Sequence, residues 1–491
     1  MNIENRKKQE INLIQDENIT YRDSLNNQKL LLRTKENNLN IKIKRKGIIE
    51  QINSNFNYIP KEQQIHINKL ETSFNTIISY LKSSNNDLIS HCLNHLVIYF
   101  KYNEPTINEQ KLIIEGQFFK ILLNLGNKFI YEKNVYDLIQ IIWILMNIQL
   151  FNEGNNDYLK IIYGEEYMEF YNECFCKMDS DEIVSEIIAL LNHIIQINSE
   201  ISIIIFQSKV FNSIIYYTKN KILDMFVKEM IIKLIVNCLN KYDNLNENEV
   251  SIINDCIIIL KNTLDYFPKE RIQLLCYEGL YKISKIDNKY NFNEILIKEK
   301  IPFQILNMKE FNNNNLLIKI LKILGNILTV SDNDCKSIYE KNIIEFYNNI
   351  LNMCDDDDKI IKIILISIFN ISDSKYRYII QDSIIWLPDK IQKYLNKNEQ
   401  ITLIFLKIIK QIINNANYNT LKFIYNTKII EYLIFMLSKG NLNENVKIKM
   451  VKVIDNYLKK FQDSERKNTE YYLIFMKFHD LIKLNVINKI D

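Results

Sequence analysis

The sequence predicts an all-α fold in which helical repeats stack into one solenoid, and three observations lead to this prediction. A polar residue recurs in apolar runs of helical period at intervals of 44 or 45 residues. The 491 residues include only 8 Gly and 5 Pro, whereas average usage would give about 34 and about 25. Hydrophobic residues make up 47% of the chain and charged residues 25%, which is typical of a protein with a large core.

The recurring polar residue is an asparagine in all but one repeat. Its positions are Asn147, Asn192, Asn237, Tyr281, Asn326 and Asn370. A period of roughly 40–47 residues is typical of armadillo and HEAT repeats, which consist of two or three helices each. Because one such unit cannot bury its apolar faces alone, neighbouring units stack around a continuous core. We therefore expect an α-solenoid of armadillo or HEAT type.

The chain is predicted to have three segments, of which the first is set apart by its charge. Residues 1–50 hold 11 Lys and Arg against 7 Asp and Glu, whereas the remaining residues carry a net charge of −1. Residues 1–50 are therefore predicted to be a basic, partly disordered arm. Residues 65–465 are expected to form the solenoid of about nine units. Residues 466–491 are predicted to be a tail that caps the C-terminal end of the solenoid. Alternatively, this tail contacts an export receptor.

An asparagine repeated once per unit has two possible roles. A side-chain amide both donates and accepts hydrogen bonds, so a row of amides can bind the backbone of an extended peptide. Trp143 lies one helical turn before Asn147, and an indole face accepts the stem and cation of a lysine. Alternatively, each asparagine bonds to neighbouring backbone and holds the repeats in register.

Four sequence features together resemble the importin α family, the armadillo adaptors of nuclear import. WILMNIQL (143–150) is similar to the second-repeat motif of that family, and LGNILTVSDND (324–334) is similar to its sixth-repeat motif. KEKIPFQIL (298–306) resembles the repeat boundary that carries Ile-Pro. The arm resembles the importin-β-binding segment, with Leu32-Arg33 followed by a cluster at 44–46.

The resemblance implies a right-handed armadillo-repeat superhelix. It also implies a nuclear import adaptor that shuttles between cytoplasm and nucleus. Its arm would bind importin β and, when free, occupy the groove, through Arg33, Lys35, Lys42, Lys44, Arg45 and Lys46. Its major groove would bind basic nuclear-localisation peptides through Trp143, Asn147, Asn192 and Asn237. Its minor groove would contain Tyr277, Asn326 and Asn370.

Several positions depart from the family pattern and keep a second hypothesis open. The tryptophan position holds Ile188, Lys233 and Ile366 in three repeats, and the eighth repeat is expected to place Lys407 and Gln411 at its two key positions. The alternative is an armadillo scaffold for protein interaction that has lost ordinary localisation-signal binding. It predicts asparagines tied into bonds between repeats, whereas the adaptor predicts an exposed asparagine ladder.

Other function classes have little support in the sequence. No Gly-rich phosphate loop or nucleophile constellation is visible, so neither an enzyme nor a cofactor is expected. His91 and His95 have a metal-compatible spacing but no evident third ligand, so no metal is expected. The longest apolar stretch, 138–151, is shorter than the roughly 20 residues that cross a bilayer. Beyond Lys46 no cluster of basic residues suggests direct nucleic-acid binding. Eight cysteines without CxxC pairs indicate reduced thiols.

Overall fold

The computed structural model divides the chain into two compact units, Met1–Lys69 and Leu70–Asp491. It describes residues 70–464 except for 104, 150–156, 179, 222, 240–244, 268, 287, 309–310, 312, 330–331, 355, 373, 375–397 and 439–441. The predicted basic arm with Arg33, Lys35, Lys42, Lys44, Arg45 and Lys46 lies outside the described residues, as does the predicted tail 466–491.

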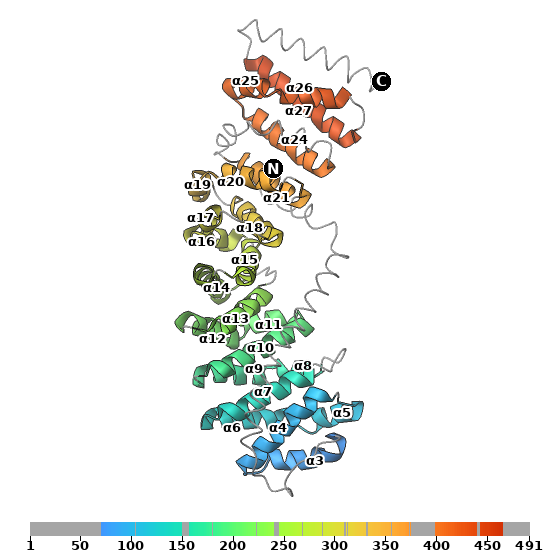
Figure 1. The fold of residues 1–491 in the computed structure, drawn as a ribbon, viewed down its shortest axis with the longest axis vertical. Helices are drawn as coiled ribbons and strands as arrows, with labels where there is room; N and C mark the ends of the chain where they lie inside the picture. The colour runs from blue at the N-terminus through green and yellow to red at the C-terminus, as the bar shows by residue number, and fades with distance from the viewer. Residues whose placement is uncertain are drawn as a thin grey trace. The chain divides into compact units, whose positions relative to one another are not determined.

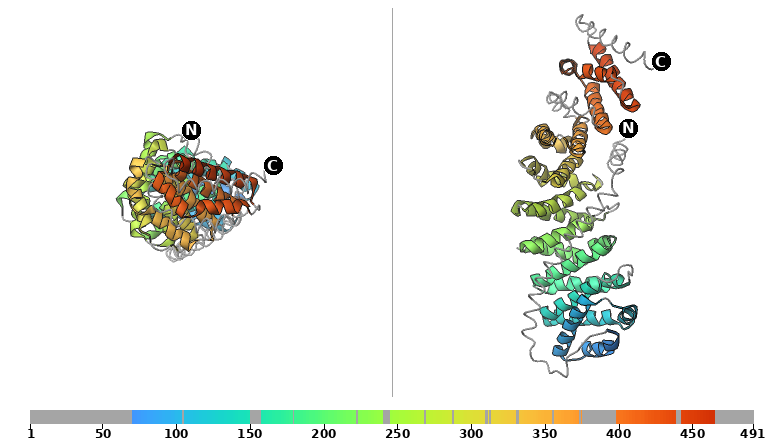
Figure 2. Two further views of the ribbon diagram at one scale, coloured as in Figure 1. Left: turned by 90° about the horizontal axis from the view of Figure 1, so that it is seen from above. Right: turned by 45° about the vertical axis from the view of Figure 1, so that its right-hand side comes forward.

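Nine helices of the second unit form a ladder in which each helix contacts the one before and the one after it. We call this set the third-helix ladder, because a unit such as α8–α9–α10 ends with it. Its members are α4 (Asn86–Tyr102), α7 (Val135–Gln149), α10 (Asp181–Ile197), α13 (Met225–Cys238), α15 (Glu270–Ser284), α18 (Asn314–Ile327), α21 (Asp358–Ser372), α24 (Glu399–Asn414) and α27 (Glu444–Ser464). Figures 1 and 2 show them following one another in chain order.

Further helices lie beside the ladder in the units that the structure describes. The second helices are α3 (Leu70–Leu81), α6 (Phe118–Glu132), α9 (Glu165–Lys177), α12 (Lys209–Asn220), α14 (Glu247–Tyr266), α17 (Ile301–Leu306), α20 (Ile343–Met353) and α26 (Ile429–Ser438). The first helices are α5 (Ile107–Glu115), α8 (Asp157–Ile162), α11 (Ile201–Gln207), the 3₁₀ turn η2 (Asn288–Tyr290) with α16 (Phe292–Lys298), α19 (Asp332–Tyr339) and α25 (Tyr418–Asn426).

Local sequence explains where these helices begin. The side chain of Ser180 accepts a hydrogen bond from the backbone N–H of Ile183 and so caps α10. Thr106 and Glu109 form a capping box at the start of α5, as Asn246 and Glu249 do at the start of α14. Such caps satisfy backbone donors that have no partner within the helix.

Rings and glycines set the contact between neighbouring units. The rings of Phe119 and Tyr158 lie 5.6 Å apart between α6 and α8, and those of Phe175 and Tyr217 lie 6.0 Å apart between α9 and α12. Gly126 in α6 lies under the ring of Phe170 in α9, where an added Cβ would be 2.5 Å from Cε2. A glycine at this point therefore lets the two helices pack closely.

The predicted all-α solenoid of armadillo type is confirmed. Within the described residues the regular elements are helices, and their contacts run from each unit to the next. None of the described helices is long and apolar enough to span a lipid bilayer.

Candidate functional site: the polar positions of the third-helix ladder

The recurring polar residues occupy equivalent positions on six successive helices of the ladder. They are Asn147 on α7, Asn192 on α10, Asn237 on α13, Tyr281 on α15, Asn326 on α18 and Asn370 on α21. The spacing of 44 or 45 residues in the sequence is therefore the distance along the chain from one ladder helix to the next.

The asparagines of α10 and α13 bond to each other's helices. Nδ2 of Asn237 donates to Oδ1 of Asn192 over 3.1 Å, and Nδ2 of Asn192 donates to the backbone O of Met230 over 3.1 Å. Asn192 is 6% exposed. Its amide is thus used in a joint between two repeats, as the register hypothesis predicts.

The same kind of joint occurs further along the ladder. Nδ2 of Asn326 on α18 donates to Oγ of Ser284 on α15 over 2.9 Å. Nδ2 of Asn370 on α21 lies 3.5 Å from the backbone O of Gly325 on α18. Each bond joins one repeat to the repeat before it.

Two further ladder asparagines were missed by the sequence reasoning. Nδ2 of Asn456 on α27 donates to Oδ1 of Asn414 on α24 over 2.5 Å. The prediction that Lys407 and Gln411 hold the key positions of the eighth repeat is wrong, because Asn414 forms the inter-repeat bond there. The signal was present: Asn414 follows Asn370 by one more interval of 44 residues.

The remaining predicted contact residues lie at buried positions. Trp143 is 3% exposed, Asn147 is 6% exposed and Tyr277 is 2% exposed. The hydroxyl of Tyr277 lies 3.7 Å from Sδ of Met308. The structure thus places Trp143 and Asn147 together on α7, where a peptide would have to displace covering atoms to reach the indole face.

Lysines stand one helical turn before several ladder asparagines. Counting back four residues gives Lys233 on α13, Lys322 on α18, Lys410 on α24 and Lys452 on α27. Burial, and second the charge of Arg271, lower the pKa of Lys233. Cations at these positions oppose the binding of a basic peptide and favour a ligand of opposite charge.

Three of the ladder's lysines surround the ring of Tyr281. The ammonium groups of Lys285, Lys319 and Lys322 lie 5.3, 5.4 and 5.1 Å from the ring centroid. Nζ of Lys322 also lies 3.5 Å from the hydroxyl of Tyr281, and Lys319 forms an ion pair with Glu278. We call Tyr281, Lys285, Lys319 and Lys322 the lysine–tyrosine cluster.

The cluster carries a positive local potential. Burial, followed by the charges of Lys359 and Lys285, lowers the pKa of Lys322 to about 8. Burial and the charges of Lys322 and Lys359 likewise lower the pKa of Lys319 to about 8. Because Lys319 also forms an ion pair with Glu278, Lys322 is the clearer indicator of the potential.

The lowered pKa of Lys322 predicts a rise in stability at alkaline pH. Between about 8, its value in the folded chain, and 10.5, its ordinary value, the unfolded chain binds more protons, so the free energy of unfolding rises with pH. The thermal midpoint of the wild type should therefore rise by about 1–3 °C relative to Lys322→Gln between pH 8 and pH 10. Circular dichroism at pH 7, 8, 9 and 10 measures this difference.

The matched control for this experiment is Lys336→Gln, which removes an exposed charge on α19. Packing lost with the lysine stem does not depend on pH, so the pH dependence isolates the charge. Parallel curves for wild type and Lys322→Gln would contradict the prediction.

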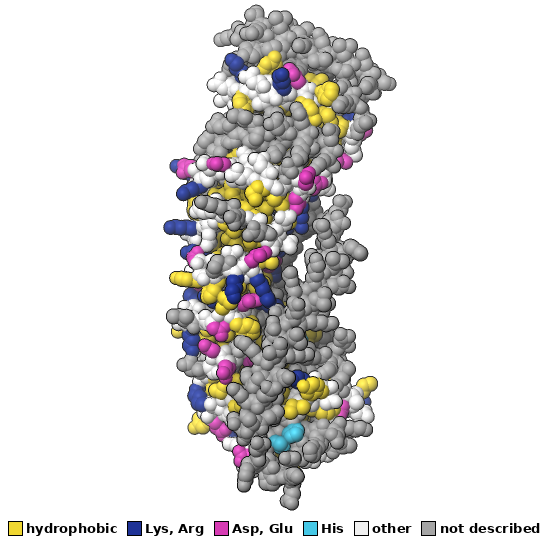
Figure 3. Space-filling model, viewed as in Figure 1, with side chains coloured by type: hydrophobic (Ala, Val, Ile, Leu, Met, Phe, Trp, Pro, Cys, Tyr) yellow, Lys and Arg dark blue, Asp and Glu magenta, His cyan; other side chains and the backbone are white. Residues whose placement is uncertain are grey.

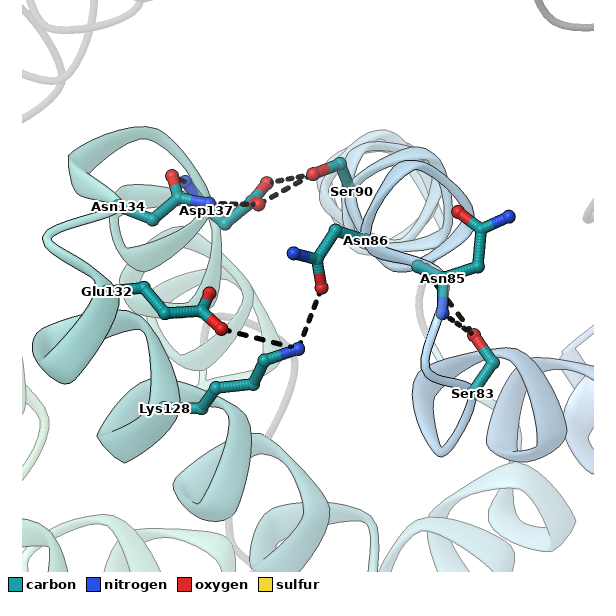
Figure 4. Close-up of polar contacts among 8 residues, drawn as sticks. All are labelled: Ser83, Asn85, Asn86, Ser90, Lys128, Glu132, Asn134 and Asp137. Atoms are coloured by element: carbon teal, nitrogen blue, oxygen red, sulfur yellow. Dashed lines mark hydrogen bonds and ion pairs between the residues drawn. The ribbon is translucent and has the colours of Figure 1, made fainter.

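A polar network fixes α7, the helix of Trp143 and Asn147, against α4 (Figure 4). Oγ of Ser90 on α4 lies 2.6 Å from both carboxylate oxygens of Asp137, and Nδ2 of Asn134 donates to Oδ2 of Asp137 over 2.7 Å. Asp137 is 1% exposed, and burial raises its pKa. Beside it Nζ of Lys128 donates to Oδ1 of Asn86 over 2.7 Å.

The described part of the chain contains no group of side chains suited to bind a metal ion. No three His, Cys, Asp or Glu residues come together there in a way that could hold a metal ion. The rings of His91 and His95 contact each other with centroids 4.4 Å apart. The eight cysteines are all free thiols.

Comparison with known proteins supports the fold alone. No family model matches the chain, and no curated protein matches it. A crystal structure described as an engineered protein is similar over 83% of this chain and 98% of its own, with 14% identity and a TM-score of 0.56. A designed armadillo repeat protein in complex with the peptide (KR)4 is similar over 49% of this chain and 97% of its own, with 13% identity and a TM-score of 0.40.

Proposed function

We propose that this chain is a non-catalytic scaffold that binds extended segments of partner proteins along its third-helix ladder. The observation that carries the proposal is the set of hydrogen bonds between repeats made by Asn192, Asn237, Asn326 and Asn370. These amides hold neighbouring repeats in register, which leaves binding to the other side chains of the ladder. Solenoids of this kind present long continuous surfaces and commonly bind other proteins through them.

A second candidate function is the nuclear import adaptor that the sequence resembles. Two observations favour it. Trp143 and Asn147 lie one turn apart on α7, and Asn192 and Asn237 follow on the next two ladder helices. The arm also carries the basic pattern of an importin-β-binding segment. In this case the chain would bind basic nuclear-localisation peptides and importin β, and would shuttle between cytoplasm and nucleus.

Titration of a lysine-rich nuclear-localisation peptide distinguishes the two functions. The scaffold predicts no measurable binding to residues 51–491. It also predicts that Asn192→Ala/Asn237→Ala lowers the free energy of unfolding by about 1–3 kcal/mol, because buried polar groups lose their partners. Isothermal calorimetry and urea unfolding measure these two quantities.

The control is Asn127→Ala, which removes an exposed asparagine of α6, outside the ladder. Micromolar binding that Asn147→Ala/Asn192→Ala weakens about tenfold, without loss of stability, would reject the scaffold and establish the adaptor.

A further inference from the structure

The lysine–tyrosine cluster brings together charges from two repeats. Tyr281 belongs to α15 and Lys285 follows the last residue of that helix, whereas Lys319 and Lys322 belong to α18. The ammonium groups of the three lysines lie within 5.1–5.4 Å of one ring centroid. An aromatic ring attracts cations to its face, so Tyr281 holds these ammonium groups close to each other.

The arrangement works against the stability of the folded chain. The like charges gathered around one ring repel each other, and burial removes part of the water that would screen them. The nearby ion pair between Lys319 and Glu278 is made within the cluster's own helices. Residues that lower stability in this way are common where a protein binds a ligand of opposite charge.

The positive charge continues into the next repeat. Lys359 on α21 is close enough to Lys319 and Lys322 to oppose their protonation. Adjacent packed helices lie about 8–10 Å apart, and an extended chain advances about 3.3 Å per residue. Successive ladder helices are therefore separated by about three residues of an extended peptide.

We propose that the lysine–tyrosine cluster is a binding site for an acidic segment of a partner protein, whose Asp or Glu carboxylates lie between the ammonium groups of α15 and α18. This inference rests on the proposed scaffold function and names the chemical class of its partner. The carboxylates would neutralise the repulsion among Lys285, Lys319 and Lys322, and their partial desolvation beside the ring would strengthen each charge-assisted hydrogen bond.

An acidic peptide fits the site better than a nucleic acid does. Base stacking needs an open aromatic face, whereas three ammonium groups already lie around the ring of Tyr281. Phosphate backbones are bound by extended basic surfaces. On the face drawn in Figure 3, basic and acidic side chains are interspersed.

The test uses the full chain and a fluorescein-labelled peptide of ten glutamates at low salt, followed by fluorescence anisotropy. We expect Lys319→Gln/Lys322→Gln to weaken binding at least about tenfold, since two charge-assisted contacts are lost. The matched control is Lys336→Gln/Lys341→Gln, which removes two exposed charges on α19 and the turn after it, and should bind within about twofold of the wild type. Thermal melting checks that each variant is folded.

Three outcomes would overturn the proposal. They are undiminished binding by Lys319→Gln/Lys322→Gln, an equal loss in the control variant, or tighter binding of a ten-nucleotide thymidine strand than of the glutamate peptide. If Lys319→Gln/Lys322→Gln does not fold, Lys285→Gln gives the same test from the residue that follows α15. Failure here leaves the scaffold in place, whereas asparagine-dependent binding of a basic peptide would reject the scaffold by a separate measurement.

Discussion

Asp137→Ala is expected to lower the free energy of unfolding of the first repeats by about 2–3 kcal/mol. The substitution leaves the hydroxyl of Ser90 and the amide of Asn134 without the carboxylate that they contact at 2.6 and 2.7 Å, and a buried polar group without its partner costs about 1–3 kcal/mol. Urea unfolding measures the change. In a Trp386→Phe background, the fluorescence of Trp143 reports on α7 alone, because the chain has two tryptophans.

The matched control is Asp87→Ala. Asp87 lies in the first turn of α4, as Asp137 does in the first turn of α7, but it is exposed. Its replacement should cost less than about 1 kcal/mol, the usual worth of an exposed acid at a helix N-terminus. Equal effects of the two substitutions would show that the hydrogen bonds of Asp137 to Ser90 and Asn134 contribute nothing to stability.

Gly126→Ala is expected to destabilise the chain by about 2 kcal/mol, although alanine favours helix over glycine by about 1 kcal/mol. The new Cβ would lie 2.5 Å from Cε2 and 2.8 Å from Cζ of Phe170. That ring is 2% exposed, so it cannot move without displacing its neighbours, and overpacking of this kind costs about 1–3 kcal/mol. Thermal and urea unfolding measure the change.

Gly325→Ala provides the comparison for the same substitution in α18. There the added Cβ would meet one atom, Oγ of Ser367, at 3.0 Å, and a shift of a few tenths of an ångström relieves that contact. We expect a change within about 1 kcal/mol of zero. A Gly126→Ala variant as stable as Gly325→Ala would mean that α6 and α9 separate easily.

The architecture could be predicted from the sequence because a polar residue recurs at the same helix position in successive repeats. Asn147, Asn192 and Asn237 keep the same place on three successive helices, and glycine is scarce because short polar turns join the helices. The repeat alignment was wrong only after Asn370. It predicted Lys407 and Gln411 for the eighth repeat, whereas the structure has Asn414 at the equivalent position.

The partners of these asparagines could not be predicted in the same way. Helical periodicity places a residue on a face, but it does not say whether its amide reaches a ligand or a neighbouring helix. The acceptors of Asn192 and Asn370 are backbone oxygens of Met230 and Gly325, which carry no sequence signal. The lysine–tyrosine cluster was missed because Lys285 and Lys322 are 37 residues apart and meet only through the packing of α15 on α18.

The direction of the asparagine bonds bears on how such an array grows. Asn237, Asn326, Asn370 and Asn456 each donate to the unit before them. A tandem duplication of one unit would therefore copy a donor on one side and an acceptor on the other. The duplicated unit would contain both the donor and the acceptor that its neighbours require. The chain could therefore lengthen by whole units while keeping the same interface between repeats.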